Sequence, residues 1–293
     1  MHRRYVVLTW FCAVVVATCV SACATAGIIY EELSPYGPII VTEHDGLRTM
    51  LFARDGARQS VVKIGDPDHL ELPYTRAALT GLALCEAPER MLIVGLGGGS
   101  LPSFLRKHYP SATIDVAELN PRVLAVAKEF FGFREDDRMH VYLGDGRQYI
   151  EKVPAQRYDI VFLDAFSADT VPPHLTTQEF LEAVRRTMRP TGVVVANVWN
   201  RSSNPLYDRM LRTYQEVFDE LLVLDVASAV NAIFLALPGR RSVSERALAQ
   251  RARAISISKS LPFDLGETVT QRFSDVREKA SAERVLHDSA LKP

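Results

Sequence analysis

The chain has 293 residues, of which 47% are hydrophobic and 24% are charged, with 34 basic and 35 acidic side chains. This length and composition are typical of one globular domain, or of one domain with a small appendage. A formal net charge of −1 gives no global attraction to a polyanion, so no nucleic-acid partner is expected.

The first 26 residues resemble an export signal. Two arginines precede an uncharged apolar run at 5–20, and small residues follow it. The run is shorter than the ~20 residues that a membrane-spanning helix needs. The segment VSAC at 20–23 resembles the lipobox of bacterial lipoproteins. We therefore expect a signal peptide over 1–22, with Cys23 lipidated and the protein held at a membrane of the cell envelope. The alternatives are an uncleaved anchor, cleavage after 24–26, and a cytoplasmic protein whose signal is not used.

One cysteine falls within the expected folded body. Cys12, Cys19 and Cys23 lie in or at the end of the signal, which leaves Cys85 in an apolar segment. One thiol cannot form an intramolecular disulfide, and Cys85 is expected to pack as a small hydrophobic residue. The seven histidines include no pair at the spacing of zinc ligands, so no metal site is expected.

Three short runs after the signal predict β-strands, at 39–45, 48–53 and 59–64. The connecting segments contain Asp45-Gly46 and Asp55-Gly56, which are strong hairpin signals. We therefore expect a small antiparallel β domain over 30–68. The stretch from Pro73 to about Cys85 is expected to form a helix that leads into the main body.

From residue 90 the pattern changes to buried strands alternating with helices. Predicted strands rich in Val, Ile and Leu lie at 91–96, 113–119, 139–144, 158–164 and 192–199. Such nearly continuous apolar runs suit strands that are covered on both faces. Helix starts are indicated by Asn120-Pro121 and by the capping-box pattern TTQE at 176–179.

The alternation predicts an α/β fold over 70–238, a doubly wound, Rossmann-like parallel sheet of the methyltransferase type. Beyond Gly239 the composition becomes polar and charged. A surface helix followed by a loosely held polar tail is expected over 239–293, with its basic residues on a solvated face.

A glycine-rich turn follows the first predicted strand of this sheet. It contains Gly95, Gly97, Gly98 and Gly99. Glycines let a ligand approach the backbone closely, and the helix that follows offers unpaired N–H groups. Tight strand-to-helix turns also need glycine for structural reasons alone, so this turn does not by itself identify a ligand.

Acidic residues follow the next three predicted strands. Glu118 lies about 20 positions beyond Gly95, where an acidic residue that binds ribose hydroxyls is expected. Asp145 follows the third strand, and Asp164 and then Asp169 follow the fourth. Because the carboxyl ends of parallel strands meet at one edge of the sheet, these side chains are expected to converge.

The ligand that suits this edge is a cationic adenosyl compound. The glycine turn lacks the lysine of a P-loop, and Ser100 stands where G-x-G-x-x-G would place its third glycine. A dinucleotide stays open as an alternative. Carboxylates can bind the ribose, the adenine amino group and the surroundings of a sulfonium, with no phosphate that requires basic neighbours.

The segments VGLGGGS, VAELN, YLGDG and YDIVFLDAFSAD, which follow a small N-terminal sheet, resemble the spermidine synthase (polyamine aminopropyltransferase) family over about residues 36–200. The resemblance implies polyamine biosynthesis: transfer of an aminopropyl group from decarboxylated S-adenosylmethionine to a small-molecule amine such as putrescine, with release of methylthioadenosine. It implies donor binding by the four glycines of the turn, by Glu118 at the ribose, by Asp145 and Gly146 at the adenine, and by Pro172.

For the amine side, the resemblance implies that Asp164 accepts the proton of the attacking amine and that Tyr74 lies beside it. An alkylammonium with a pKa of about 10 cannot attack until it loses a proton, and a neighbouring carboxylate can hold the cation and take that proton. The sulfonium is already a good leaving group, so most of the remaining catalysis is alignment.

Several positions depart from the family's pattern. Ser100 replaces the aspartate of the glycine loop, Thr75 replaces a His or Gln, and Gly37 replaces a Gln. The second carboxylate of the loop after the fourth strand falls on Ser167, so Asp169 is a displaced candidate. The family's Pro-Tyr-Pro-Gly segment is absent from 225–239. Residues for the adenosyl group are thus kept while those for amines are mostly replaced, which indicates a divergent spermidine synthase-like branch.

Three functions follow as hypotheses. The leading one is aminopropyl transfer, with Tyr74, Ser100 and Asp169 on the substrate side. Methyl transfer from S-adenosylmethionine is the second, because Ser100 is neutral. The third is an inactive, envelope-anchored binding protein, since adenosyl donors are made in the cytoplasm. His174 could reach the site from its loop, although a structural hydrogen bond is favoured for it. A homodimer is kept as one option for the oligomeric state.

Overall fold

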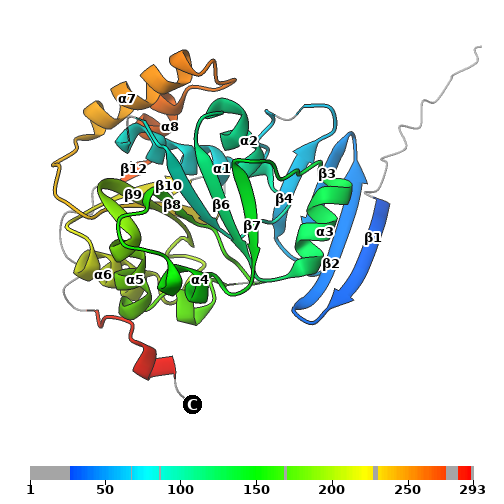
Figure 1. Ribbon diagram of the computed structural model, residues 1–293, viewed down its shortest axis with the longest axis horizontal. Helices are drawn as coiled ribbons and strands as arrows, with labels where there is room; N and C mark the ends of the chain where they lie inside the picture. Colours follow the sequence, from blue (N-terminus) through cyan, green and yellow to red (C-terminus); the bar gives the residue numbers. More distant parts are fainter. Residues whose placement is uncertain are drawn as a thin grey trace, which may run out of the picture.

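The computed structural model describes residues 27–66, 68–85, 87–167, 170–226, 230–274 and 283–291. The expected signal segment and Asp169 lie outside these residues. The described chain forms a small antiparallel sheet beside a larger mixed sheet that carries helices on both faces (Figure 1). This is the predicted α/β fold with a small N-terminal sheet.

The small sheet has the strand order β1-β2-β3-β4. Its strands are β1 (Gly27–Ser34), β2 (Gly37–His44), β3 (Leu47–Leu51) and β4 (Arg58–Lys63). Hairpin turns connect successive strands, and Asp45 and Gly46 both have positive φ between β2 and β3, as the Asp-Gly signal predicts. Strand β1 was missed in the sequence because its acidic residues hide the alternation.

The large sheet has the order β12-β10-β11-β9-β8-β5-β6-β7. Its strands are β5 (Arg90–Val94), β6 (Thr113–Glu118), β7 (Met139–Leu143), β8 (Tyr158–Leu163), β9 (Met188–Trp199), β10 (Glu220–Val226), β11 (Asn231–Leu237) and β12 (Phe273–Ser274). Strands β5 to β9 are parallel, as predicted, whereas β11 pairs antiparallel with both β9 and β10. The antiparallel strands were not predicted.

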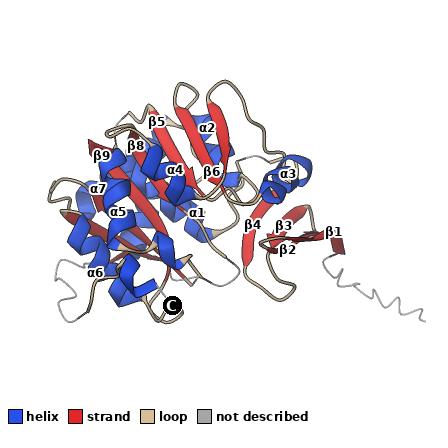
Figure 2. Cartoon of the chain, turned by 60° about the horizontal axis from the view of Figure 1, so that its bottom comes forward, coloured by secondary structure: helices blue, strands red, loops and turns tan. Residues whose placement is uncertain are grey.

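Helices cover both faces of the large sheet. They are α1 (Pro73–Ala78), α2 (Ser100–His108), α3 (Pro121–Phe130), α4 (Gly146–Lys152), α5 (Gln178–Thr187), α6 (Tyr207–Val217), α7 (Glu245–Ser258) and α8 (Leu265–Arg272). Figure 1 shows α4, α5 and α6 on one side of the sheet and α1, α2, α7 and α8 on the other. Figure 2 shows the small sheet at the end of the large sheet that carries β6 and α3.

The predicted helix starts carry side-chain caps. The Asn120 side chain accepts a hydrogen bond from the Arg122 amide, with Pro121 at the first helical position. Helix α5 is capped one residue later than the TTQE pattern predicts: the side chain of Thr177, and not of Thr176, accepts a hydrogen bond from the Phe180 amide, and Glu179 accepts one from the Asp288 amide. The expected helix at 73–85 is shorter than predicted, because α1 gives way to the 3₁₀ helix η1 (Leu79–Leu84).

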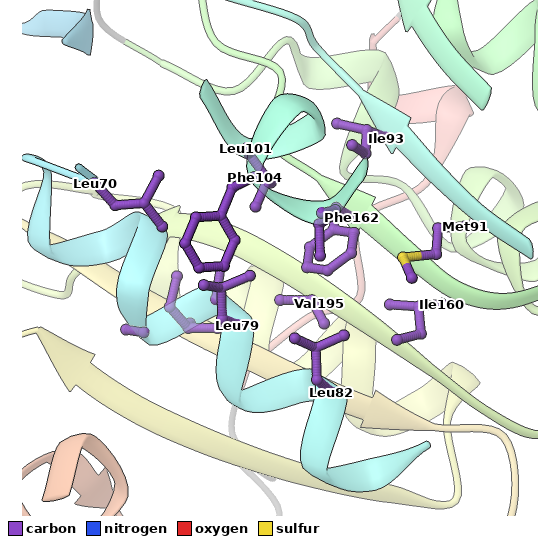
Figure 3. Packing of buried hydrophobic residues seen from close by; sticks show 14 of the residues in the cluster. Leu70, Leu79, Leu82, Met91, Ile93, Leu101, Phe104, Ile160, Phe162 and Val195 are labelled. Atoms are coloured by element: carbon purple, nitrogen blue, oxygen red, sulfur yellow. The ribbon is translucent and has the colours of Figure 1, made fainter. Parts of the chain in front are cut away.

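The core on the α1 side is closed by η1 packing on the sheet. Leu79 and Leu82 are fully buried and face the strand residues Ile160, Phe162 and Val195 (Figure 3). The methyl and ring contacts in this layer hold α1 and its Tyr74 against the strands that end at the site.

The C-terminal region differs from the predicted polar tail. Helices α7 and α8 pack on η1 and on the sheet, and Leu248, Ala252, Leu265 and Val269 are fully buried in the main core. The polar composition concealed a narrow apolar stripe, because most other positions of these short helices face solvent. Residues 245–274 therefore belong to the folded body, contrary to the expected loosely held tail.

This packing predicts a large difference between two substitutions on α7. Leu248→Ala should lower the free energy of unfolding by about 2–5 kcal/mol, because it empties a buried site. Ile257→Ala, on the same helix but with its side chain 74% exposed, should change it by less than about 0.5 kcal/mol. Chemical denaturation measures both. Equal effects would show that α7 does not contribute to the core.

Candidate active site

A pocket lies where the carboxyl ends of β5, β6 and β8 meet strand β4 of the small sheet and helix α1. Its walls contain several of the predicted residues: Tyr74, Gly95, Gly97, Ser100, Glu118, Asp145, Gly146, Asp164 and Pro172. His174 also lines it. The strand ends thus converge on one cavity, and the small sheet supplies its opposite wall.

The glycine turn brings the end of β5 against the end of β8. Gly95 has a φ of +100°, and a Cβ atom there would lie 2.3 Å from the Asp164 carbonyl oxygen, so no side chain fits. Gly95 and Gly97 line the pocket. Gly98 instead faces Phe131, whose ring would lie 2.6 Å from an added Cβ, and Gly99 faces Phe133. The last two glycines therefore serve the tight packing of the turn.

Glu118 ends β6 and is 7% exposed. Its carboxylate accepts hydrogen bonds from the backbone amides of Leu96, at 2.9 Å, and Asn120, at 2.7 Å. Burial raises the pKa of Glu118 above its ordinary value, although these amides oppose the rise. The two amides also fix the rotamer, which leaves the remaining lone pairs of the carboxylate available to a ligand in the pocket.

Asp145 caps helix α4 and pairs with His174. One carboxylate oxygen accepts from the Gln148 amide at 2.9 Å, and the other lies 2.8 Å from His174 Nε2. Burial raises the pKa of Asp145, but the bonds from Gln148 and His174 outweigh it, and the pKa falls below its ordinary value. The structural hydrogen bond expected for His174 is therefore present, and it is made to a residue of the pocket itself.

Asp164 follows β8 and lies between polar groups of two other elements. Asn197 of β9 donates a hydrogen bond to one carboxylate oxygen at 2.8 Å, and the Tyr74 side chain of α1 forms another. Burial raises the pKa of Asp164 from 3.8 to about 7, against the lowering effect of both bonds. The pKa of Tyr74 is also raised well above its ordinary value by burial, so its hydroxyl stays protonated.

Two asparagines behind Asp164 were missed in the sequence. Asn231 of β11 donates to the Asn197 side-chain oxygen at 2.8 Å, and the two residues are 8% and 6% exposed. The available signal was a polar residue in each of two otherwise apolar strands. Their partners could not be deduced, because the antiparallel pairing of β9 with β11 was not predicted.

Ser100 and Thr75, two of the residues that depart from the family's pattern, are also hydrogen-bonded. The Ser100 hydroxyl lies 3.2 Å from the Ser60 hydroxyl of β4 and donates to the Val61 carbonyl at 3.3 Å. Thr75 lines the pocket, but its hydroxyl donates to the Leu72 carbonyl at 2.6 Å. Ser60 was not predicted, because nothing in a short N-terminal strand indicates that it faces the glycine turn.

The departures at Gly37 and Ser167 lie away from these hydroxyls. Gly37 begins β2 with a positive φ at the hairpin after β1. Ser167 donates to the Thr170 carbonyl at 2.9 Å and is exposed. Neither residue is among those that line the pocket within the described part of the chain.

Glu71 adds a carboxylate that the sequence did not single out. It precedes α1, lines the pocket, and lies 2.7 Å from His69 Nε2. The hydrogen bond from His69 lowers the pKa of Glu71, so this side chain is ionised. With it, the acidic residues of the pocket number four: Glu71, Glu118, Asp145 and Asp164. This arrangement favours a cationic ligand.

Within the described ranges, no group of three or more His, Cys, Asp or Glu side chains is arranged to hold a metal ion. Among the helices of those same ranges, none is long and apolar enough to cross a membrane. Cys85 is free and packs against the core, and burial raises the pKa of its thiol to about 11, which suppresses its reactivity.

Because the pKa of Asp164 is raised, Asp164→Asn is expected to increase the thermal stability of the protein by an amount that depends on pH. Ionising a carboxylate with a folded pKa of about 7 and an unfolded pKa near 4 opposes folding increasingly as the pH rises between these values. Asparagine cannot ionise. The Tm of Asp164→Asn relative to the native protein should therefore increase from pH 4 to about pH 7 and then level off, in scanning calorimetry. A difference that is constant over this range would contradict the raised pKa.

Comparisons with known proteins agree with this geometry. A family model described as "Spermine/spermidine synthase domain" matches residues 72–223. The polyamine aminopropyltransferase of Vibrio vulnificus (strain CMCP6) is 36% identical over 246 residues, which cover 80% of each protein.

Two solved structures have a similar fold. A probable spermidine synthase from Corynebacterium glutamicum ATCC 13032 matches with a TM-score of 0.70 and 21% identity, over 90% of this chain and 97% of that one. Human methyltransferase-like protein 13 in complex with SAH matches with a TM-score of 0.59 and 33% identity, over 66% of this chain and 94% of that one. The family model, which matches more than half of the chain, and the Vibrio relative show that the chain belongs to the spermine/spermidine synthase family.

Proposed function

We propose that this protein transfers an aminopropyl group from decarboxylated S-adenosylmethionine to a small amine. The observation that carries the proposal is Asp164, a carboxylate with a pKa of about 7 that lines the same pocket as Glu118 and Asp145. The family to which the chain belongs, and the aminopropyltransferase activity named for the Vibrio relative, support the same reaction.

Asp164 has the properties of a general base for this chemistry. The amine nitrogen attacks the carbon next to the sulfonium, a C–N bond forms, the C–S bond breaks, and methylthioadenosine leaves. The proton lost by the amine passes to the carboxylate. A base with a pKa near neutrality is ionised at working pH and still holds a proton well enough to remove it from the amine.

The opposite side of the pocket suits a nucleoside. Glu118 accepts one backbone amide on each oxygen, and a carboxylate has about four lone-pair sites, so ribose hydroxyls can add to them. Asp145 is held by the α4 amide and by His174, and it would accept from the adenine amino group. Gly146 and Pro172 line the same wall. Gly146 packs against Val94, whose Cγ1 would lie 2.5 Å from an added Cβ, so the backbone of α4 can lie close to strand β5.

The acceptor would enter beside α1 and the small sheet. Asp164 and Glu71 give this side of the pocket negative charge, and Phe52 and Tyr74 give it aromatic surface. Aromatic faces and carboxylates together attract organic ammonium groups. A small amine is therefore the acceptor class that we propose.

Methyl transfer from S-adenosylmethionine is the second candidate. The hydroxyls of Ser60 and Ser100 lie by the N-terminus of α2, and neither is acidic. Such a neutral, amide-rich position would tolerate the donor's carboxylate. The human relative bound to SAH supports this reading.

We also propose that the protein is exported and held at a membrane by a lipid on Cys23. The support is the signal-like sequence at 1–22 with its lipobox at 20–23. The mature protein purified from its own cells should begin at Cys23 and carry the mass of added acyl chains. Intact-protein mass spectrometry after fractionation tests this. An unprocessed Met1 or an unmodified cysteine would refute it.

The activity itself is tested by incubating the purified chain with decarboxylated S-adenosylmethionine and a series of mono- and diamines. Methylthioadenosine should form only when Asp164 is ionised. Its rate of formation should therefore rise by up to about tenfold for each pH unit below pH 7 and become constant above that pH. Asp164→Asn should reduce kcat by at least 100-fold while donor binding changes little.

Glu129→Gln, at an exposed position on α3, is the matched control and should retain full activity. Formation of SAH from S-adenosylmethionine, without methylthioadenosine, would favour the methyltransferase instead. Tight binding of methylthioadenosine with no turnover of either donor would indicate an inactive binding protein.

A further inference from the structure

The side-chain amides of Asn197 and Asn231 form a line of hydrogen bonds that ends at Asp164. Asn231 Nδ2 lies 2.8 Å from Asn197 Oδ1, and Asn197 Nδ2 lies 2.8 Å from Asp164 Oδ1. Ile233 of β11 pairs with Asn197 of β9, so Asn231, two residues away, lies on the same face of the sheet. Both asparagines thus project toward the layer that holds Tyr74 of α1.

We propose that Asn231 is a positioning residue, which fixes the Asn197 amide so that its N–H group, and not its oxygen, faces Asp164. Its role in catalysis rests on the proposed function of Asp164. The direction of the hydrogen bonds, from Asn231 to Asn197 and from Asn197 to Asp164, does not depend on that function.

The two ends of a side-chain amide are unlike, because the oxygen accepts hydrogen bonds and the nitrogen donates them. Asn197 fits its site equally well when turned by 180°, but then its oxygen would face the Asp164 carboxylate. Asn231 donates to Asn197 Oδ1, so Asn197 can turn only if this bond breaks or the Asn231 amide turns as well. Both asparagines are more than nine-tenths buried, so water cannot easily replace the bond that either would lose.

The orientation matters because Asp164 changes protonation. An N–H donor stabilises the ionised carboxylate, whereas a carbonyl oxygen in its place is tolerated only when Asp164 carries the proton. Loss of Asn231 would let Asn197 turn and would hold Asp164 protonated to higher pH.

Among the described residues, the other groups near Asp164 do not orient the Asn197 amide. Tyr74 also donates to Asp164, and its own proton is retained over the whole working range. The glycine turn adds no charge, and the loop residues Ala165 and Phe166 add none. The remaining ionisable side chains of the pocket pair with other partners within the described residues: Glu71 with His69, Glu118 with backbone amides, and Asp145 with His174.

The test compares Tm against pH for four proteins: the native chain, Asp164→Asn, Asn231→Leu and the double variant. The difference in Tm between Asp164→Asn and its parent protein should grow with pH until the pH passes the folded pKa of Asp164, and be constant above it. The pH at which the difference levels off therefore reports that pKa, and no substrate is needed. In the Asn231→Leu background this pH should be higher by about half to one pH unit. An unchanged value would overturn the proposal.

Thr80→Val is the matched control. Thr80 is fully buried in the same layer and donates to the Ala77 carbonyl, and no hydrogen bond connects it to Asp164. It should lower Tm equally at every pH. Should Asn231→Leu fail to fold, Asn231→Ala is measured in the same way, and the same outcome decides.

Turnover provides a second readout. Asn231→Leu should lower kcat at pH 6 by about 3- to 10-fold, approach the native value above pH 8, and leave the KM for the donor unchanged. A uniform loss at all pH values would indicate a merely structural role and refute the proposal. A native chain that releases no methylthioadenosine would refute the proposed function instead, while the thermal comparison still decides the role of Asn231.

Discussion

The close approach of two strand ends at Gly95 is the constraint on which the site depends. An added Cβ would lie 2.3 Å from the Asp164 carbonyl oxygen, so only glycine allows β5 and β8 to end side by side here. This contact sets Asp164 at the floor of the pocket, and the Leu96 amide that follows it binds Glu118 from the next strand. One turn therefore holds two of the four carboxylates of the pocket in place.

The environment then gives each carboxylate a different character. Glu118 is buried against backbone amides, Asp145 caps a helix and pairs with His174, and Asp164 lies among side-chain amides and a tyrosine. Burial raises the pKa of Asp164 to about 7, while the pKa of Asp145 falls below its ordinary value. Such a separation of pKa values supports the proton-accepting role that we propose for Asp164, while Asp145 stays ionised as a hydrogen-bond acceptor.

Much of this arrangement could be predicted from the sequence, because it follows from local rules. Apolar strands, capped helix starts and acidic residues at successive strand ends identified Glu118, Asp145 and Asp164 as neighbours. The contributions of Ser60, Asn197 and Asn231 could not be predicted, since each depends on pairing between distant segments. The burial of α7 and α8 was hidden for a related reason: Leu248 and Val269 form too narrow a stripe to stand out among charged residues.

The proposed function requires that the strand-end carboxylates form one nucleoside pocket. Titration calorimetry with methylthioadenosine tests it most directly, with the native chain, Glu118→Gln and the exposed control Glu129→Gln. We predict saturable binding that Glu118→Gln weakens by about 10- to 100-fold, the loss expected for charge-assisted bonds to ribose, with no change in the control. Binding that is equal in all three proteins would contradict the account.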